Sequence, residues 1–249
     1  MKISVITCVY NRVATIADAI DSVSAQTYGE VEHIIVDAQS DDGTLDVIRA
    51  RQHDRLHLES GPDAGIYDAL NKGCARATGD IVGVVHSDDW LADERVLAWV
   101  AAAFAEGADV VYGDLDYVSA RDPSRVIRAW KTGAFNLARL KWGWMPPHPA
   151  LFVRRELLAE LGFYNTTYRI AADYDLVLRL FSRTSLRAAY IPRVLVKMRT
   201  GGASNGSLRQ VLRKSAEDYR ALRANRIGGA ATLLAKNLRK VGQLLPGGP

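Results

Sequence analysis

Cysteine is scarce in this 249-residue sequence, which contains Cys8 and Cys74 and no others. Two cysteines cannot supply the disulfide framework of a small secreted domain, and two alone do not make a zinc site. The scarcity therefore argues against a scaffold held by disulfides or zinc, and it favours a reducing, cytoplasmic setting.

Long hydrophobic runs are missing as well. No window approaches 18 consecutive apolar residues, so the sequence predicts no membrane-spanning helix. The first apolar run, within MKISVITCVYNR, is too short for the core of a signal peptide and is typical of a strand. Repeats and low-complexity tracts are absent. With 48% hydrophobic residues, the chain can bury the core of one large domain or of a domain with an appendage.

Positive charge is spread unevenly along the chain. The formal net charge is +4, but residues 207–249 hold nine Lys and Arg against two acids, which makes this segment +7 and the remainder −3. A basic tail on a neutral-to-acidic body indicates either a segment that meets an anionic surface or a solvated helix face.

The first half of the chain alternates between strand and helix patterns. Val- and Ile-rich segments separated by amphipathic ones predict an α/β fold with a mostly parallel sheet and helices on both faces. The expected strands are residues 3–10, 32–38, 55–60, 80–89 and 109–118, and the expected helices are residues 15–26, 42–52, 66–77 and 94–107. Ligands bind beyond the carboxyl ends of such strands, so the residues that follow each strand are the first candidates for a site.

The second half is less regular. Strands are expected at residues 125–131, 149–155 and 188–200, and a helix with a charged start at residues 172–183. Two basic helices are expected after the Gly-rich segment 201–207, divided near Gly228 and Gly229.

Two adjacent carboxylates, Asp88 and Asp89, follow the fourth expected strand in VVHSDDW. They repel each other unless a cation is present, and carboxylate oxygens suit Mg²⁺ or Mn²⁺, whose coordination is often completed by substrate phosphates. Helix capping is the alternative role, because Asp is also favoured at a helix start. The position at the end of a central strand favours the metal.

Asp37 ends the second expected strand, and a turn with Asp42 and Thr44 follows it. Asp42 and Thr44 are interpreted as caps of the next helix. Asp37 lies too far upstream for capping, so contact with the base or ribose of a nucleotide is the favoured role.

The motifs of the chain occur in the order TCVYNR, VDAQSDDGT, GPDAGIYDALNKG, HSDDW, HPALFVRR, AADYDLVLRL and GGAS. Over about residues 2–205, this order resembles the family-2-type glycosyltransferases with the GT-A (Rossmann-like) fold, in particular the bacterial branch that assembles cell-surface polysaccharides. The resemblance implies a GT-A domain over residues 1–205, with a nucleotide-binding half (1–118) and an acceptor-binding half (119–205). Residues 206–249 would form a basic helical tail.

The resemblance also implies roles for individual residues. Asp37 would hydrogen-bond the nucleotide base, Asp88 would lie near the ribose, and Asp89 would hold Mn²⁺ or Mg²⁺ against the diphosphate. The residues implied as walls of the nucleoside pocket are Thr7, Tyr10 and Arg12.

The segment GPDAGIYDALNKG resembles the Gly…Asn-x-Gly element that the family places beside the donor, although Leu70 replaces the common Arg. The residues expected to face the donor sugar or nucleotide are Asp63, Tyr67 and Asp68. The alternative for Asp68 is a surface ion pair with Lys72, one helical turn away.

Asp173, in IAADYDLVLRL, is the predicted general base. Transfer from a nucleotide-diphosphate sugar needs one base to deprotonate the acceptor hydroxyl, and Asp173 begins a helix after two alanines that add no competing polar group. The family usually has Glu before this Asp, where this chain has Ala172. A single base predicts one displacement at the anomeric carbon and therefore inversion. A helix cap is the alternative role.

His148 and Arg199 are the remaining candidates. His148 follows a rigid Pro-Pro turn beside the expected acceptor side, where a substrate contact and a structural role are equally open. Arg199 precedes two glycines and is a candidate for contact with the diphosphate. Trp142 and Trp144 would stack on sugar or lipid or pack in the core. His86, adjacent to the Asp pair, is the other histidine worth testing.

The sequence thus predicts an inverting, metal-dependent glycosyltransferase. It would move a sugar from a nucleotide-diphosphate sugar, with a UDP-sugar favoured, to a hydroxyl of a glycan or a polyprenyl-diphosphate-linked acceptor. A sugar nucleotidyltransferase needs a Gly-rich loop after the first strand, and TCVYNRVAT has no glycine. Loss of Asp89 or Asp173 would indicate a non-catalytic nucleotide-sugar-binding protein, and both are present. Nucleic acid is not an expected partner, and a homodimer is left open.

The last expected helix has the pattern of an interfacial basic helix. Its apolar residues fall mostly on one side (Leu233, Leu234, Leu238, Val241, Leu244 and Leu245), opposite Lys236, Arg239 and Lys240. We expect peripheral attachment to the cytoplasmic face of the membrane, where a lipid-linked acceptor would lie. Packing on the body or on a dimer partner is the alternative.

Overall fold

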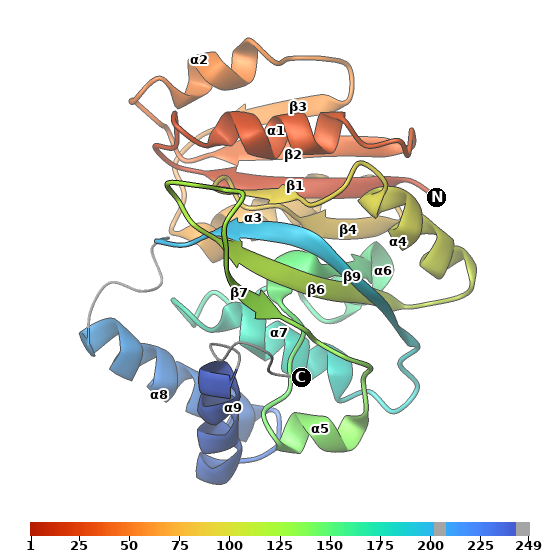
Figure 1. Ribbon diagram of the computed structural model, residues 1–249, viewed down its shortest axis with the longest axis vertical. Coiled ribbons are helices and arrows are strands. Elements are labelled where there is room, and N and C mark those ends of the chain that lie inside the picture. Colours follow the sequence, from red (N-terminus) through yellow and green to blue (C-terminus); the bar gives the residue numbers. More distant parts are fainter. Residues whose placement is uncertain (202–207, 243–249) are drawn as a thin grey trace.

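The computed structural model describes residues 1–201 and 208–242, which form one α/β body (Figure 1). Within these residues nine strands make a single sheet, in the order β3-β2-β1-β4-β8-β6-β9-β5, with β7 paired to β6. The strands are β1 (Ile3–Val9), β2 (Val31–Asp37), β3 (Leu56–Ser60), β4 (Ile81–Val84), β5 (Asp89–Leu91), β6 (Val110–Val118), β7 (Val126–Trp130), β8 (Leu151–Arg154) and β9 (Ala188–Arg199).

The helices of the described residues alternate with these strands. They are α1 (Ile16–Ser24), α2 (Thr44–Arg49), α3 (Ile66–Arg76), α4 (Val96–Ala105), α5 (Leu137–Lys141), α6 (Arg155–Glu160), α7 (Ala172–Phe181), α8 (Leu208–Ala224) and α9 (Ala230–Gly242). A short 3-10 helix, η1 (His148–Ala150), precedes β8. The predicted α/β fold with helices on both faces of the sheet is confirmed.

The first four strands of the sheet order, β3-β2-β1-β4, are all parallel, as predicted. Every residue of β1 and β2 is buried, which matches their nearly continuous Val and Ile content. Because these strands run in one direction, Val9, Asp37, Ser60 and Val84 all lie at the same edge of the sheet. This edge is where the candidate site forms.

The remaining strands make the sheet mixed. β8 runs antiparallel to both β4 and β6, β9 runs parallel to β6, and β5 runs antiparallel to β9. The strand expected over residues 80–89 is two strands, because a turn closed by the bond from Asp89 N–H to the His86 carbonyl (3.0 Å) redirects the chain. Asp89 therefore lies on β5, paired with Met198 of β9.

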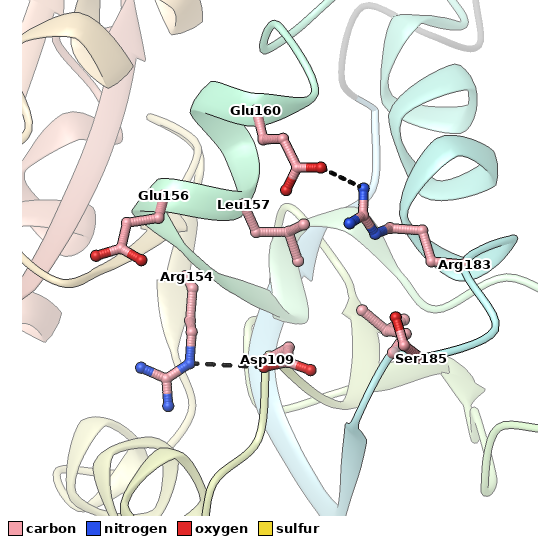
Figure 2. A pocket seen from close by; sticks show the side chains of 8 residues that line it. Asp109, Arg154, Glu156, Leu157, Glu160, Arg183 and Ser185 are labelled. Carbon is pink, nitrogen blue, oxygen red and sulfur yellow. Dashed lines mark hydrogen bonds and ion pairs between the residues drawn. The ribbon is translucent and has the colours of Figure 1, made fainter.

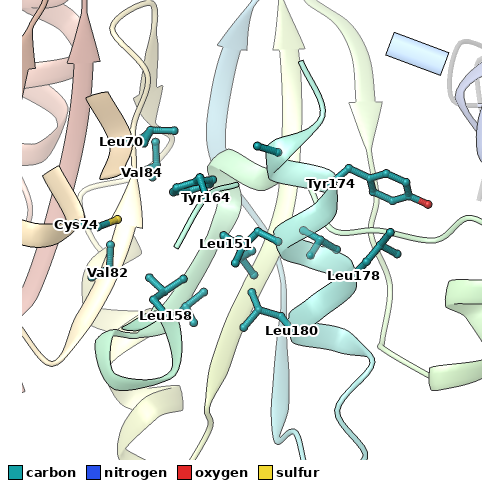
Figure 3. Packing of buried hydrophobic residues seen from close by; sticks show 14 of the residues in the cluster. Leu70, Cys74, Val82, Val84, Leu151, Leu158, Tyr164, Tyr174, Leu178 and Leu180 are labelled. Carbon is teal, nitrogen blue, oxygen red and sulfur yellow. The ribbon is translucent and has the colours of Figure 1, made fainter. Parts of the chain in front are cut away.

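Helices cover both faces of the sheet. α1 and α4 share one buried cluster, and α3 and α7 contribute to another on the opposite face. This second cluster extends from Leu70 of α3 and Val84 of β4 to Leu178 of α7 (Figure 3). Gly73 lets α3 approach the sheet, since a Cβ there would lie 2.5 Å from Cγ2 of Ile6. The close approach explains the glycine of the Asn-x-Gly element.

The basic C-terminal helices pack on the body. Leu222 of α8 belongs to the same buried cluster as α7. On α9, Lys236 is 3% exposed; its Nζ lies 2.8 Å from the Asp218 carboxylate and 3.2 Å from the centre of the Tyr174 ring. A buried ammonium with both a carboxylate and an aromatic face is well compensated. Figure 1 shows α8 and α9 beside α7, at the end of the molecule away from β3.

The polarity predicted for the last helix is wrong at Lys236, which was placed on the solvent side. Lys236 points into the body, whereas Leu234 and Leu238 are each 61% exposed. Leu233 packs partly against the core. The predicted positions Leu244 and Leu245, and most of the Gly-rich segment, lie outside the described residues. Across residues 1–201 and 208–242, no helix combines the length and the apolar character needed to cross a bilayer.

Candidate active site

A pocket of about 550 Å³ opens at the edge where the parallel strands end. It is lined by the segments that follow these strands, including Tyr10, Arg12, Ala38, Gln39, Asp63, Ile66 and Ser87. Of the residues predicted to contact the nucleotide sugar, Tyr10, Arg12 and Asp63 line this pocket. Tyr10 is 58% exposed, so its ring is available to stack on a planar ligand.

Two loops of the pocket adopt left-handed backbone conformations at residues other than glycine. Asn11 has φ of 51° and Gln39 has φ of 59°. The two loops are tied together: the Asn11 side chain donates to Asp41 (2.9 Å) and accepts from the Asp41 backbone (3.0 Å). Such conformations persist only where surrounding bonds fix them, and they cluster at ligand sites. The sequence reasoning missed this pairing, for which Asn11 was the available signal.

Thr7 does not line the pocket, so its predicted role in the pocket wall is wrong in this structure. The side chain is fully buried within the sheet. Its hydroxyl donates to the Val85 carbonyl (2.8 Å) and bonds the His33 ring (2.8 Å). Burial lowers the pKa of His33 to about 3, which keeps the ring neutral. Thr7 thus fastens β1 to β2 and β4 beneath the pocket.

Asp37 ends β2 at the pocket edge, but its carboxylate is fully buried. It accepts hydrogen bonds from the Ser60 hydroxyl (2.6 Å) and the Ser40 backbone N–H (3.1 Å). These bonds hold the loop that carries Gln39 into the pocket. The predicted contact between Asp37 and a base stays a prediction.

Tyr67 and Asp68 do not line the pocket, although both were expected to face the donor. Asp68 turns back to the Ala64 backbone N–H (3.1 Å) and to Lys72 (2.9 Å). Lys72 in turn donates to the Pro62 carbonyl (2.7 Å). The ion pair that was the alternative for Asp68 is therefore present, and it braces the turn before α3.

Asp89 and Asp88 lie at the far side of the same edge. Asp89 is fully buried, and neither of its carboxylate oxygens has a hydrogen-bond partner of normal geometry. Burial and the neighbouring charge of Asp88 raise the pKa of Asp89 well above its usual range, more than Arg199 lowers it. An ionised carboxylate in such a place needs a compensating cation.

The residues present fit a divalent metal ion. Asp89 and Asp88 offer hard carboxylate oxygens, which Mg²⁺ and Mn²⁺ prefer. No group of three or more His, Cys, Asp or Glu side chains converges as a cage within residues 1–201 and 208–242. A site with one or two carboxylates is the kind that substrate phosphates complete.

Arg199 is committed elsewhere than predicted. Its guanidinium pairs with Asp18 of α1, donates to the Asp88 carbonyl (3.1 Å) and lies 4.5 Å from the centre of the Trp90 ring. The side chain is 13% exposed. In this structure Arg199 fixes the β4–β5 turn. Its contact with a diphosphate stays a prediction.

Asp173 lies in the first turn of α7 and is partly exposed. The Tyr67 hydroxyl donates to its Oδ1 (3.2 Å) and to the Ile170 carbonyl (2.7 Å). Burial works to raise the pKa of Asp173, but the charges of Lys214, His148 and Lys236 outweigh it and hold the pKa below its usual range. Asp173 is therefore an ionised carboxylate at neutral pH, able to accept a proton.

Two histidines lie between the Asp pair and Asp173. The His86 and His148 rings are 5.9 Å apart, and His148 Nε2 bonds the Tyr164 hydroxyl (2.7 Å). Burial lowers the pKa of His148 to about 4, against the opposing charge of Asp173. His86 feels both Asp88 and Asp173, and burial still lowers its pKa. His86 thus interacts electrostatically with both Asp88 and Asp173.

The two tryptophans before His148 differ. Trp144 is buried, and its ring N–H donates to the Thr132 carbonyl (2.9 Å), which is a core role. Trp142 is 66% exposed and remains available for sugar or lipid.

A second hollow, of about 250 Å³, lies at the opposite edge of the sheet (Figure 2). It is beside the start of β4, because Arg154, which lines it, pairs with Ile81. Four of its charged side chains pair within the protein, Arg154 with Asp109 (3.8 Å) and Arg183 with Glu160 (2.9 Å), and the fifth, Glu156, is exposed to solvent. This hollow offers no unpaired group of the kind found at Asp89.

Comparison with known proteins agrees with this geometry. The model of the family described as glycosyl transferase family 2 matches residues 4–162. A "PGL/p-HBAD biosynthesis glycosyltransferase" of Mycobacterium bovis is 36% identical over 208 residues, which are 81% of this chain and 78% of the relative.

Solved structures show the same fold. Residues 1–349 of TarS from S. aureus match with a TM-score of 0.69 at 21% identity, over 91% of this chain and 65% of that one, so this chain spans just under two thirds of that structure. A mannosyltransferase from Pyrobaculum calidifontis, solved with GDP-Man and Mn²⁺, matches with a TM-score of 0.66 at 22% identity, over 94% of this chain and 68% of that one.

The fold is that of GT-A glycosyltransferases, and the family match makes this chain a glycosyltransferase. The chain belongs to glycosyl transferase family 2.

Proposed function

We propose that this glycosyltransferase is inverting and depends on a divalent metal ion, Mn²⁺ or Mg²⁺. It transfers the sugar of a nucleotide diphosphate, with UDP favoured, to a hydroxyl of a glycan or polyprenyl-diphosphate-linked acceptor in cell-surface polysaccharide synthesis. The observation that carries the proposal is the buried Asp89 carboxylate, whose oxygens have no hydrogen-bond partner of normal geometry, at the same edge as the pocket.

The donor occupies the pocket between the β1 and β3 loops. Tyr10 stacks on the base, and Arg12 and Asp63 contact the nucleoside or its sugar, since all three line the pocket. Asp89, with Asp88 beside it, holds the metal ion. When bound, the ion neutralises the charge of the leaving diphosphate.

Asp173 takes the proton of the acceptor hydroxyl. The acceptor oxygen then forms the new bond to the anomeric carbon, the bond from that carbon to the diphosphate oxygen breaks, and the nucleoside diphosphate leaves. Tyr67 orients Asp173 through its hydrogen bond. One base and one displacement give inversion.

Structurally similar glycosyltransferases support a nucleotide sugar as the class of donor. TarS has been solved with UDP and with UDP-GlcNAc, and the mannosyltransferase with GDP-Man and Mn²⁺. Thermal unfolding with a panel of UDP-, GDP- and dTDP-sugars, each with Mn²⁺ or EDTA, identifies the donor, because bound ligand raises the midpoint. UDP-sugars are expected to give the largest shift; equal small shifts for all would contradict a donor site here.

The catalytic roles are tested by transfer and donor hydrolysis with Mn²⁺. Asp173→Asn is expected to lower transfer about 10³-fold with donor binding intact, the scale of a lost general base. Asp89→Ala is expected to lower transfer about as much and to abolish the Mn²⁺ requirement for nucleotide binding. Unchanged rates in either variant would refute the role assigned to that residue. The anomeric configuration of the product, read by NMR, tests inversion.

We further propose that α9 attaches the enzyme to the cytoplasmic face of the membrane. Support comes from Leu234 and Leu238, both exposed on a strongly basic segment. Replacing both with Asn is expected to reduce co-sedimentation with anionic vesicles. The control replaces Val126 and Ile127, an exposed apolar pair on β7 (47% and 45% exposed), with Asn. Equal binding by wild type and the α9 variant would exclude this surface.

A further inference from the structure

Glu217 of α8 makes an unusual set of bonds to the main chain ahead of α7. Its Oε2 accepts three backbone N–H groups in a row, from Arg169 (3.0 Å), Ile170 (2.8 Å) and Ala171 (3.1 Å). The residue is 8% exposed. The last of these amides lies two residues before Asp173, the proposed base.

Ile170 is held from both sides. Its N–H donates to Glu217 and its carbonyl accepts from the Tyr67 hydroxyl (2.7 Å), which also donates to Asp173. α8 and α3 therefore meet across the segment that delivers Asp173. Hydrogen bonds to an ionised acceptor are roughly twice as strong as neutral ones, so three on one carboxylate fix this main chain firmly.

Glu217 is suited to remain charged in this place. Burial works to raise its pKa, but the N–H groups of Ile170, Arg169 and Ala171, and then Arg213, lower it below the usual range. The chain has Ala172 beside Asp173, so no carboxylate is adjacent in sequence. Glu217 brings one to the same stretch of main chain from a helix 44 residues further on.

We propose that Glu217 is a positioning residue for glycosyl transfer. By holding residues 169–171, it keeps the Asp173 carboxylate where the acceptor hydroxyl arrives. α8 is then part of the catalytic unit and not an accessory tail. The proposal rests on the proposed role of Asp173 as base.

The test compares Glu217→Ala and Glu217→Gln in the full-length chain. Glu217→Ala is expected to lower kcat for transfer 10- to 100-fold, with the KM for the donor and the thermal shift caused by the UDP-sugar with Mn²⁺ unchanged. Glu217→Gln keeps an oxygen acceptor without the charge, so it is expected to recover part of the loss. A purely structural role would not give this split between kcat and donor KM.

Arg220→Ala is the matched control. Arg220 also fastens α8 to the neighbouring loop, but through the Thr167 carbonyl (2.9 Å) and the Tyr168 ring and not through the N–H groups of residues 169–171. It is expected to change kcat less than twofold. Equal losses of kcat in Arg220→Ala and Glu217→Ala would show that only docking of α8 matters, and would overturn the proposal.

A cycle with Asp173→Asn separates this proposal from the one on which it rests. Glu217→Gln is expected to have no further effect on the residual rate of Asp173→Asn, since it acts through Asp173. The same factor lost in both backgrounds overturns the positioning role, even if Glu217→Ala fails to fold. If Asp173→Asn retains full activity, the base assignment falls and the positioning role falls with it. If Asp173→Asn is inactive while Glu217→Gln is normal, only the positioning role falls.

Discussion

The β4–β5 turn and the start of α7 each present one carboxylate to the candidate site, and the chain surrounds them differently. Asp89 is buried without a hydrogen-bond partner of normal geometry beside a second acid, and its pKa is raised. Asp173 receives the Tyr67 hydroxyl and the charges of Lys214 and His148, and its pKa is lowered. The protein itself supplies partners to Asp173, whereas neither oxygen of Asp89 receives a hydrogen bond of normal geometry.

Glu32 extends the comparison, because it is a carboxylate that the chain satisfies fully. It accepts from the Ser4 hydroxyl (2.5 Å), the Thr78 backbone (2.7 Å) and the Thr78 hydroxyl (2.7 Å), and pairs with Lys2 (2.5 Å). Burial alone would raise its pKa, but Lys2 and these bonds lower it to about 2.

Glu32→Gln should therefore give the largest loss of stability. The folded pKa is below the unfolded one, so the stabilisation is fully present above about pH 4.5 and is lost as pH falls toward about 2. We expect about 2 kcal/mol at pH 7, a discounted figure because Lys2 is 39% exposed and solvent screens the pair.

Urea unfolding at pH 7 and pH 3 measures this difference, which should shrink at the lower pH. Glu59→Gln is the control, since Glu59 pairs with Arg76 where both side chains are solvated (36% and 49% exposed). A penalty for Glu32→Gln that is the same at both pH values would show that its charge is not what stabilises.

Asp89→Ala should behave in the opposite way. Without metal, removing a buried carboxylate that lacks hydrogen-bond partners of normal geometry is expected to raise the free energy of unfolding by about 1 kcal/mol, because the desolvation cost disappears. Asp173→Ala, in contrast, is expected to lower it. Thermal unfolding in EDTA compares the two variants. A lower midpoint for Asp89→Ala would mean that the chain does compensate this charge. The environments of Asp89 and Asp173 would then not differ in the way described.

Tyr67→Phe tests the environment of Asp173. It removes the hydroxyl that bonds Asp173 and Ile170, so we expect kcat for transfer to fall about 5- to 10-fold, on the order of 1 kcal/mol. The KM for the donor should not change. Tyr190→Phe is the control, because it loses a bond of 2.7 Å to Asp114 outside the site and should affect stability alone. Equal rates in both variants would remove Tyr67 from the machinery.

The sequence predicted much of the edge of the sheet where the pocket opens, because the sequence signals for strands and their ends are local. Parallel strands bring their ends together, so the segments that carry Tyr10, Arg12 and Asp63 were candidates from their positions after strands, and all three residues line the pocket. Asp89 was a candidate for the same reason, and its contact with a metal ion stays a prediction. The local sequence does not determine what a side chain contacts. The Thr7 hydroxyl bonds the Val85 carbonyl within the fold, and the Asp37 carboxylate accepts from Ser60 of a neighbouring strand.

The sequence pattern did not predict the environment of Asp173. Its neighbours come from α3, from the η1 segment and from α8, through Tyr67, His148 and Lys214. Glu217 was counted only as one of two acids in a basic tail, because no spacing links it to the main chain 46 to 48 residues earlier. Contacts of this kind depend on how α8 packs, which hydrophobic periodicity does not determine.

Asp68→Ala is the smallest expected effect and tests the segment where prediction and structure diverge most. Asp68 and Lys72 form a partly exposed pair one helical turn apart, so the loss of stability should be below about 0.5 kcal/mol. Transfer rate and donor preference should stay within twofold, because the side chain faces Ala64 and Lys72 and not the pocket. Lys72→Ala is the matched variant and should behave alike. A changed donor preference in Asp68→Ala alone would mean that α3 presents this carboxylate to the sugar once the donor is bound, and the pocket would then extend one helical turn further along α3 than it does in this structure.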